Sequence, residues 1–252
     1  MFTEQIDIDA VCARAESLCR TVAPLDLGDT PLYIVPQSRL PDELGGKAVC
    51  DGFTSPSLDL YVQDVIGPAW RGRGACMVVN DTDFGGQMDA FDIESAISGI
   101  ALHELAHILE RPAAYRDRQG ADPLRIQFEA LCLGDAVSHE PTPAEIAAPF
   151  QGHGLRFIRA ALHLRHRADL AGTLVSIYYY CAGTYYGLSH PNRYRDALGD
   201  EPAQLANMSI RDILDTEYPE AFWHQWTTDV ACWFSGCSPS SERSLSQCLS
   251  LP

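Results

Sequence analysis

Positively charged residues are scarce in this sequence, and lysine is almost missing. The 252 residues include 18 lysines and arginines, among which Lys47 is the single lysine, against 34 aspartates and glutamates. The formal net charge is therefore −16. A surface of this sign repels the phosphates of nucleic acids, so we do not expect a nucleic acid as a partner.

Long apolar runs are also missing, and so are the marks of a secretory leader. No stretch approaches the roughly 18 consecutive apolar residues that a membrane-spanning helix needs. The first ten residues, MFTEQIDIDA, are acidic and lack the basic and apolar regions of a signal peptide. The sequence therefore predicts no membrane partner, no export by that route, and a cytoplasmic location.

The nine cysteines form no CxxC pair, which argues against a zinc ribbon. In a reducing compartment, cysteines scattered in this way are predicted to be buried free thiols. Hydrophobic residues make up 46% of the chain and charged residues 21%. This composition is typical of a folded globular protein and excludes disorder as a description of the whole chain.

The spacing of apolar residues predicts one helix, then short strands, then helices only. Helical spacing covers residues 5–22, 93–110, 123–138 and 154–170, and strand-like runs cover 32–35, 58–62 and 75–79. The stretch 36–57 is rich in Pro, Gly, Asp and Ser and is predicted to be a loop. This order predicts an α+β fold with a small N-terminal sheet and a predominantly helical remainder.

We expect a single domain over residues 1–234. Its last part, residues 171–234, is predicted to be helical and is rich in aromatic residues. The serine-rich residues 235–252 are predicted to form a mobile tail.

The segment with the clearest chemistry is HELAH, in which His103 and His107 bracket Glu104. It lies within the predicted helix 93–110, where residues four apart share one face with Cβ atoms about 5–6 Å apart. Two imidazoles at that spacing can chelate one zinc ion. Glu104 lies about 100° around the helix axis, where it can reach a water but is poorly placed as a ligand. The motif therefore predicts two metal ligands and a general base.

A catalytic zinc ion takes a third protein ligand, and two residues qualify. His153 lies between two glycines, which let the backbone approach closely, just before the predicted helix 154–170. Glu129 lies on the predicted helix 123–138, which follows the motif. Both alternatives stay open on spacing alone.

The HELAH motif followed by the segment GHGLRF, at 152–157, resembles the SprT-like group of zinc metallopeptidases, in which HExxH is followed by an HGxxF-type segment. The resemblance spans residues 97–163. It implies a zincin-like fold, His103, His107 and His153 as zinc ligands, and Glu104 as the catalytic base.

The alternative third ligand has a resemblance of its own. Glu129-Ala130 followed by Asp135 is similar to the NEAxSD segment of thermolysin-like peptidases, which implies Glu129 as the third zinc ligand. Of the two alternatives, we favour the one with His153.

Both resemblances imply a zinc-dependent hydrolase that acts on a peptide or protein substrate. In zincins, an edge strand upstream of the metal-binding helix aligns the peptide by strand addition, and Ala75–Val79 is the strand predicted to do so here. A tyrosine or histidine often stabilises the oxyanion. The tyrosines within 178–186, or His190, could take this role.

Two other functions compete with this prediction. One is a non-catalytic metal-binding protein that keeps a zincin-like scaffold, although a purely structural site would not need Glu104. The other is a helical interaction module whose aromatic C-terminal part covers a partner. The helix 154–170 contains a basic set that is predicted to be a solvated face: Arg156, Arg159, Arg165, His166 and Arg167.

Overall fold

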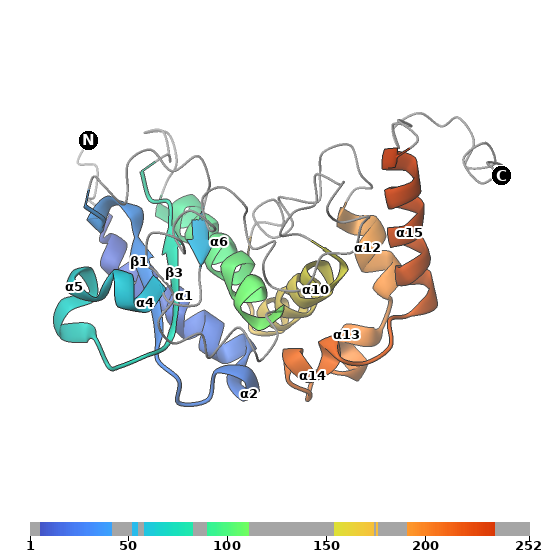
Figure 1. Ribbon diagram of the computed structural model, residues 1–252, viewed down its shortest axis with the longest axis horizontal. Helices are drawn as coiled ribbons and strands as arrows, with labels where there is room; N and C mark the ends of the chain where they lie inside the picture. Colours follow the sequence, from blue (N-terminus) through green and yellow to red (C-terminus); the bar gives the residue numbers. More distant parts are fainter. Residues whose placement is uncertain are drawn as a thin grey trace.

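The computed structural model describes residues 6–41, 52–54, 58–82, 90–110, 154–173, 175 and 191–234. Within these ranges the chain is mostly helical and has one small sheet near its N-terminus (Figure 1). The predicted α+β composition is therefore confirmed. The predicted helix 123–138, the tail 235–252, His153, Glu129, His190 and the tyrosines within 178–186 lie outside the described residues.

The elements of the N-terminal part are α1 (Ile8–Val22), α2 (Pro24–Leu27), β1 (Leu32–Pro36), η1 (Gln37–Arg39), β2 (Gly52–Thr54), α4 (Leu58–Tyr61), α5 (Gln63–Ile66), η2 (Gly67–Ala69) and β3 (Ala75–Val79). The long helices α6 (Ala90–Glu110) and α10 (Leu155–Leu170) follow. The C-terminal part holds α12 (Pro191–Leu198), α13 (Glu201–Gln204), α14 (Ile210–Leu214) and α15 (Glu220–Phe234). The predicted helices 5–22, 93–110 and 154–170 are confirmed as α1, α6 and α10.

The sheet has the strand order β1-β3-β2, with β1 parallel and β2 antiparallel to β3. The prediction that Ala75–Val79 is an edge strand is therefore wrong, because β3 pairs on both sides. Its run from Cys76 to Val79 is buried without interruption, which is typical of a strand covered on both faces.

Each face of the sheet has its own helical cover. Leu32 of β1 and Met77 and Val79 of β3 belong to the main core together with α1 and α6. Tyr33 and Val78 belong to a second core cluster, on the opposite face, with α4 and α5. The alternation of side chains along a strand thus fills two separate cores from the same short sheet.

The sequence-based assignment was wrong for two segments around this sheet. Residues 58–61 form a helix rather than a strand, and Leu58 and Val62, four residues apart, are both buried in the second core cluster. A five-residue apolar run fits a strand and a helix face equally well. The stretch 36–57, predicted to be a loop, contains β2, which has only three residues and includes a glycine.

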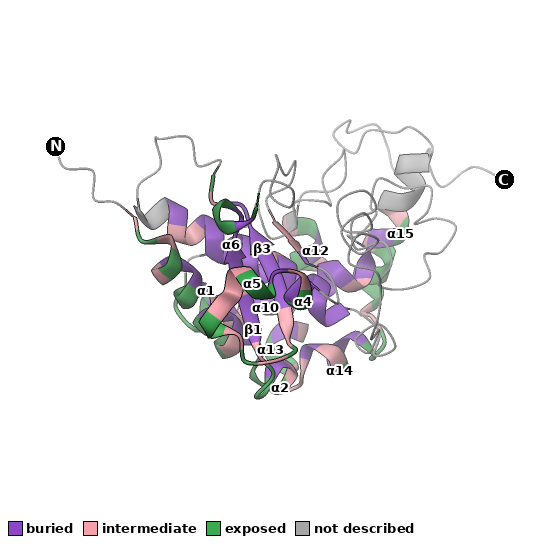
Figure 2. Cartoon of the chain, turned by 60° about the vertical axis from the view of Figure 1, so that its left-hand side comes forward, coloured by how far each residue is buried: buried purple, intermediate pink, exposed green. Residues whose placement is uncertain are grey.

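Helix α6 is central to the fold. It packs against α1, α10, β2 and β3, and Figure 2 shows buried residues concentrated in α6, β3 and α10. Such a helix must be apolar around most of its circumference, and isoleucine, leucine and alanine do predominate in its second half, ISGIALHELAHILE. The HELAH motif is thereby placed in the protein interior.

The basic face predicted on α10 is not solvated throughout. The side chain of Arg159 is fully buried and donates to the Glu201 carboxylate at 2.9 Å and to the carbonyls of Thr216 and Glu217 at 3.0 and 2.9 Å. His163, one turn further along, is equally buried, and its Nε2 lies 2.8 Å from Glu201 Oε1. The prediction was wrong because periodicity does not reveal which carboxylates and carbonyls a long side chain can reach.

Other arginines of α10 also tie elements together. Arg156 donates to the carbonyl of Leu214 at 2.8 Å, and Arg167 donates to the carbonyls of Val22 and Met208 at 3.0 and 2.6 Å. These bonds join α10 to α14 and to the end of α1. The position of α10 relative to α1 and α14 therefore rests on polar bonds as well as on apolar packing.

Three cysteines within the described residues agree with the prediction of buried free thiols. Cys12, Cys19 and Cys76 are free and buried. Burial raises the pKa of Cys12 and of Cys19 to about 12 and that of Cys76 well above its ordinary value. Thiols in this state are poor nucleophiles and poor metal ligands.

Candidate metal centre

The two histidines of the HELAH motif lie together in the interior. His107 and Glu104 are 4% and 3% exposed, and His103 is partly buried. The Nε2 atoms of His103 and His107 are 3.3 Å apart, with ring centroids at 4.9 Å and an interplanar angle of 74°. The predicted convergence of the two imidazoles is present at the level of the ring nitrogens.

This separation fits a shared zinc ion. With Zn–N bonds of about 2.0–2.1 Å in a tetrahedral site, two ligand nitrogens lie about 3.3–3.4 Å apart. The observed 3.3 Å matches that value. The two rings can therefore accept a metal with little rearrangement.

Phe157 of α10 packs against the side of the histidine pair. Its fully buried ring stacks on His107 with centroids 4.2 Å apart and an angle of 23°, and it meets His103 edge-on at 4.8 Å. Phe157 is the phenylalanine of the GHGLRF segment, three residues after Gly154, the N-cap of α10. The segment that contains His153 thus continues into a helical turn that contacts both histidines, while His153 itself lies outside the described residues.

Glu104 lies next to strand β2. A Cβ atom added to Gly52 would lie 3.1 Å from Glu104 Oε1, 2.6 Å from Ile100 Cγ2 and 3.0 Å from the carbonyl oxygen of Val78. Only a glycine lets β2 pass α6 so closely. Sequence analysis could not predict this contact, because a glycine in a loop-like stretch usually indicates a turn rather than a close approach of two elements.

Glu110 is a further residue that the sequence analysis missed. Its Oε1 lies 2.9 Å from His107 Nδ1, and the two side chains are 2% and 4% exposed. The three-residue spacing on one helix could have indicated this pair. A carboxylate on the nitrogen remote from the ligand position is a common companion of metal-binding histidines.

Within the described ranges, no third histidine, cysteine, aspartate or glutamate joins the pair in a metal-binding arrangement. Both third-ligand candidates, His153 and Glu129, lie outside those ranges.

Among the described helices, none has the length and apolar character required to cross a membrane. Comparisons of the chain with protein-family models, with curated proteins and with solved structures each gave no match.

Proposed function

We propose that this protein is a zinc-dependent peptidase with a zincin-like fold, in which His103, His107 and His153 hold the metal and Glu104 is the general base. The main observation behind the proposal is the 3.3 Å separation of the two Nε2 atoms, which suits a single zinc ion. The HELAH motif and the HGxxF-type segment, which resemble those of SprT-like metallopeptidases, support it further.

A zinc ion bound there would polarise the scissile carbonyl and make water a stronger nucleophile near neutral pH. The carboxylate of Glu104 takes a proton from the attacking water and passes it to the amine that leaves. Burial of Glu104 favours this role, because a hydrogen bond between the carboxylate and that water is stronger where the local dielectric is low. His103 and His107 stay neutral so that each offers an Nε2 lone pair.

The third ligand is proposed to be His153. It directly precedes Gly154, the N-cap of α10, and the first turn of that helix contains Phe157, whose ring touches both histidines. Chain connectivity alone thus keeps His153 within one residue of a helix end that packs near the pair. Glu129 is 19 residues along the chain from Glu110, the nearest described residue.

The proposed substrate is a peptide in an extended conformation. Within the described residues β2 pairs with β3 on one side only, and its Gly52 lies directly against Glu104. We propose that this outer edge, rather than β3, aligns the peptide by strand addition. The scissile bond would then pass close to the base.

The first test is the zinc content of the purified protein by elemental analysis, after incubation with zinc and removal of excess. We expect one zinc per chain in the wild type, loss of zinc in His103→Ala and His153→Ala, and retention in Glu129→Ala. The exposed histidine of α15 supplies the control His224→Ala, which should keep its zinc. A wild type that binds no zinc would contradict the proposal.

The second test is peptidase activity on an unstructured protein substrate. Glu104→Gln should keep the metal and lose activity by about 10²–10⁴-fold, the usual contribution of a general base. In the zinc measurement, loss of zinc in Glu129→Ala with retention in His153→Ala would instead assign the third ligand to Glu129. Full activity in Glu104→Gln would refute the role of Glu104.

A further inference from the structure

The carboxylate of Glu110 occupies an unfavourable place unless it has a specific partner. Glu110 is the last residue of α6 and is 2% exposed. The C-terminal end of a helix carries partial negative charge, and a buried carboxylate needs hydrogen bonds to offset its lost hydration. The bond to His107 Nδ1, at 2.9 Å, provides such a partner.

This bond determines which nitrogen of His107 carries the proton. With Glu110 ionised, its carboxylate only accepts hydrogen bonds and Nδ1 is the donor. In the neutral imidazole the lone pair then belongs to Nε2, the atom that lies 3.3 Å from His103 Nε2. Phe157, stacked on the same ring at 4.2 Å, restricts its rotation.

We infer that Glu110 is a positioning residue that fixes the tautomer and orientation of His107, so that Nε2 is available to the metal before the metal binds. The part of this inference that concerns metal binding rests on the proposed function, whereas the part that concerns the tautomer of His107 does not. Glu110 contacts neither metal nor substrate in this role and acts only through His107.

The chain contains an internal reference with the opposite arrangement. His163 is fully buried and meets a carboxylate through Nε2 instead, at 2.8 Å from Glu201 Oε1. The same reasoning predicts a proton on Nε2 of His163 and a lone pair on Nδ1. These two buried histidine–glutamate pairs should therefore show opposite tautomers.

The test is ¹⁵N–¹H correlation NMR of the ring nitrogens in metal-free protein at about pH 8, where imidazoles with ordinary pKa values are neutral. We expect the Nδ1–H tautomer for His107 and the Nε2–H tautomer for His163 in the wild type. Glu110→Met, which has a similar size but no carboxylate, should lose the Nδ1–H preference of His107. Glu110→Gln keeps an acceptor oxygen and should retain it.

Zinc affinity, measured by competition with a chromophoric chelator, provides the second readout. We expect Glu110→Met to bind zinc about 10–100-fold more weakly than the wild type, the usual effect of losing such a partner, and Glu110→Gln to lose less. The control is Glu94→Gln, a partly exposed glutamate of the same helix that pairs with Arg14, and it should bind like the wild type. Circular dichroism checks that each variant is folded.

The outcomes separate this inference from the proposed function. If the wild type binds zinc while Glu110→Met keeps both the Nδ1–H tautomer and the full affinity, the inference fails and the peptidase proposal stands. If the wild type binds no zinc, the proposed function fails and the metal-orienting role fails with it, whatever the tautomer.

Discussion

At the scale of single residues, Gly52 couples the sheet to the metal-binding helix. A Cβ at this position would lie 2.6 Å from Ile100 Cγ2 and 3.0 Å from the backbone oxygen of Val78. Since β3 is central and its displacement would disturb the whole sheet, Gly52→Ala should push β2 away from α6. We expect a loss of about 1–3 kcal/mol in the free energy of unfolding, as for other overpacked sites, measured by urea denaturation.

The matched control for Gly52→Ala is the double variant with Ile100→Ala, which removes the side chain that the new methyl group would meet. Its loss of stability should be smaller than the sum of the two single losses. Additive losses would show that the contact between β2 and α6 is not what makes glycine necessary.

Residues differ in how much of their role the sequence reveals. The shared face of His103 and His107 follows from helical periodicity, because both lie on one helix. Phe157 and Gly52 reach the site from other elements, and only the packing of α10 and β2 on α6 brings them there. Local pattern therefore predicted the histidine pair but could not predict which residues other elements bring to it.

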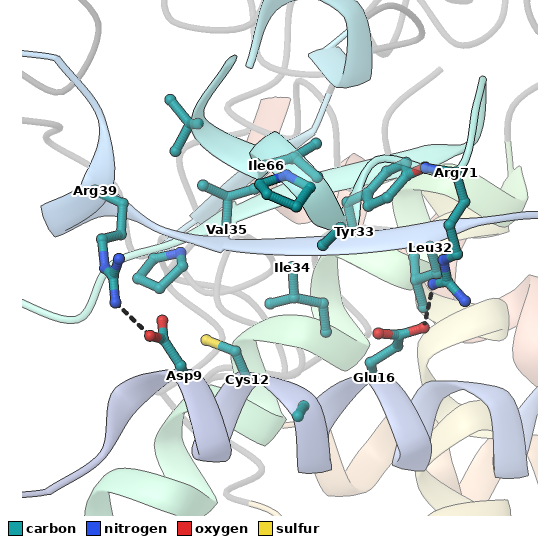
Figure 3. Close-up of a pocket in the computed structure, with 15 residues that line it drawn as sticks. Asp9, Cys12, Glu16, Leu32, Tyr33, Ile34, Val35, Arg39, Ile66 and Arg71 are labelled. Carbon is teal, nitrogen blue, oxygen red and sulfur yellow. Dashed lines mark hydrogen bonds and ion pairs between the residues drawn. The ribbon is translucent and has the colours of Figure 1, made fainter. Parts of the chain in front are cut away.

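At the scale of elements, the outer edge of β1, which pairs with no other described strand, is protected by charge. A groove of about 680 Å³ runs along it between α1 and the segment formed by α5 and η2, with Arg39–Asp9 and Arg71–Glu16 ion pairs at its two ends (Figure 3). The carbonyl of Pro31 accepts a bond from the N–H of Ala75 in β3. By the alternation of a parallel ladder, Ile34 turns its N–H and C=O toward the groove.

Proteins commonly protect such an edge with charged side chains. The double variant Asp9→Lys with Glu16→Lys should open both ion pairs, since each lysine would face an arginine. It also removes the Arg20–Glu16 pair within α1. We expect greater self-association than in the wild type, measured by sedimentation velocity over a range of concentrations. The ion pairs are exposed or partly exposed, so each contributes little to stability, and the monomer should stay folded.

The control for the edge variant must change the net charge equally. Asp196→Lys with Asp215→Lys removes two exposed partners of arginines, one on α12 and one directly after α14, and it makes the chain less acidic by the same amount. Self-association in the control equal to that of the edge variant would attribute the effect to net charge rather than to β1.

The sequence predicted the long helices well but not the short elements. The helices α1, α6 and α10 begin and end close to the predicted positions, because their apolar periodicity extends over several turns. The short elements β2 and α4 contain too few residues to show a period. Their conformation is set by tertiary contacts, such as the bonds from the Gly74 N–H and from Arg73 Nε to buried Asp59 of α4.

At the scale of the whole molecule, the polar cluster of Arg159, His163 and Glu201 joins α10 to the C-terminal helices and thus holds the helix that contains Phe157. Burial lowers the pKa of His163 and outweighs the opposing bond to Glu201. Burial alone would raise the pKa of Glu201, but the bonds from His163 and Arg159 lower it on balance. Both groups therefore bind protons less readily in the folded protein than in the unfolded chain.

Stability must then fall as the pH falls. The contribution of His163 to the free energy of unfolding is complete above its unfolded pKa of 6.5. It is lost as the pH drops through the lower pKa of the folded protein. The contribution of Glu201 is complete above its unfolded pKa of 4.5 and is lost at more acidic pH. The melting temperature of the wild type should therefore fall between about pH 8 and pH 5, as the stabilising contribution of His163 is lost.

The variant His163→Gln isolates this contribution, because glutamine can still donate to Glu201 but does not titrate. We expect it to abolish most of the pH dependence of the wild-type melting temperature in that range. The exposed His224 provides the control, since His224→Gln should leave the profile unchanged. A profile of His163→Gln with the same slope as the wild type would mean that other groups govern the acid sensitivity of the fold.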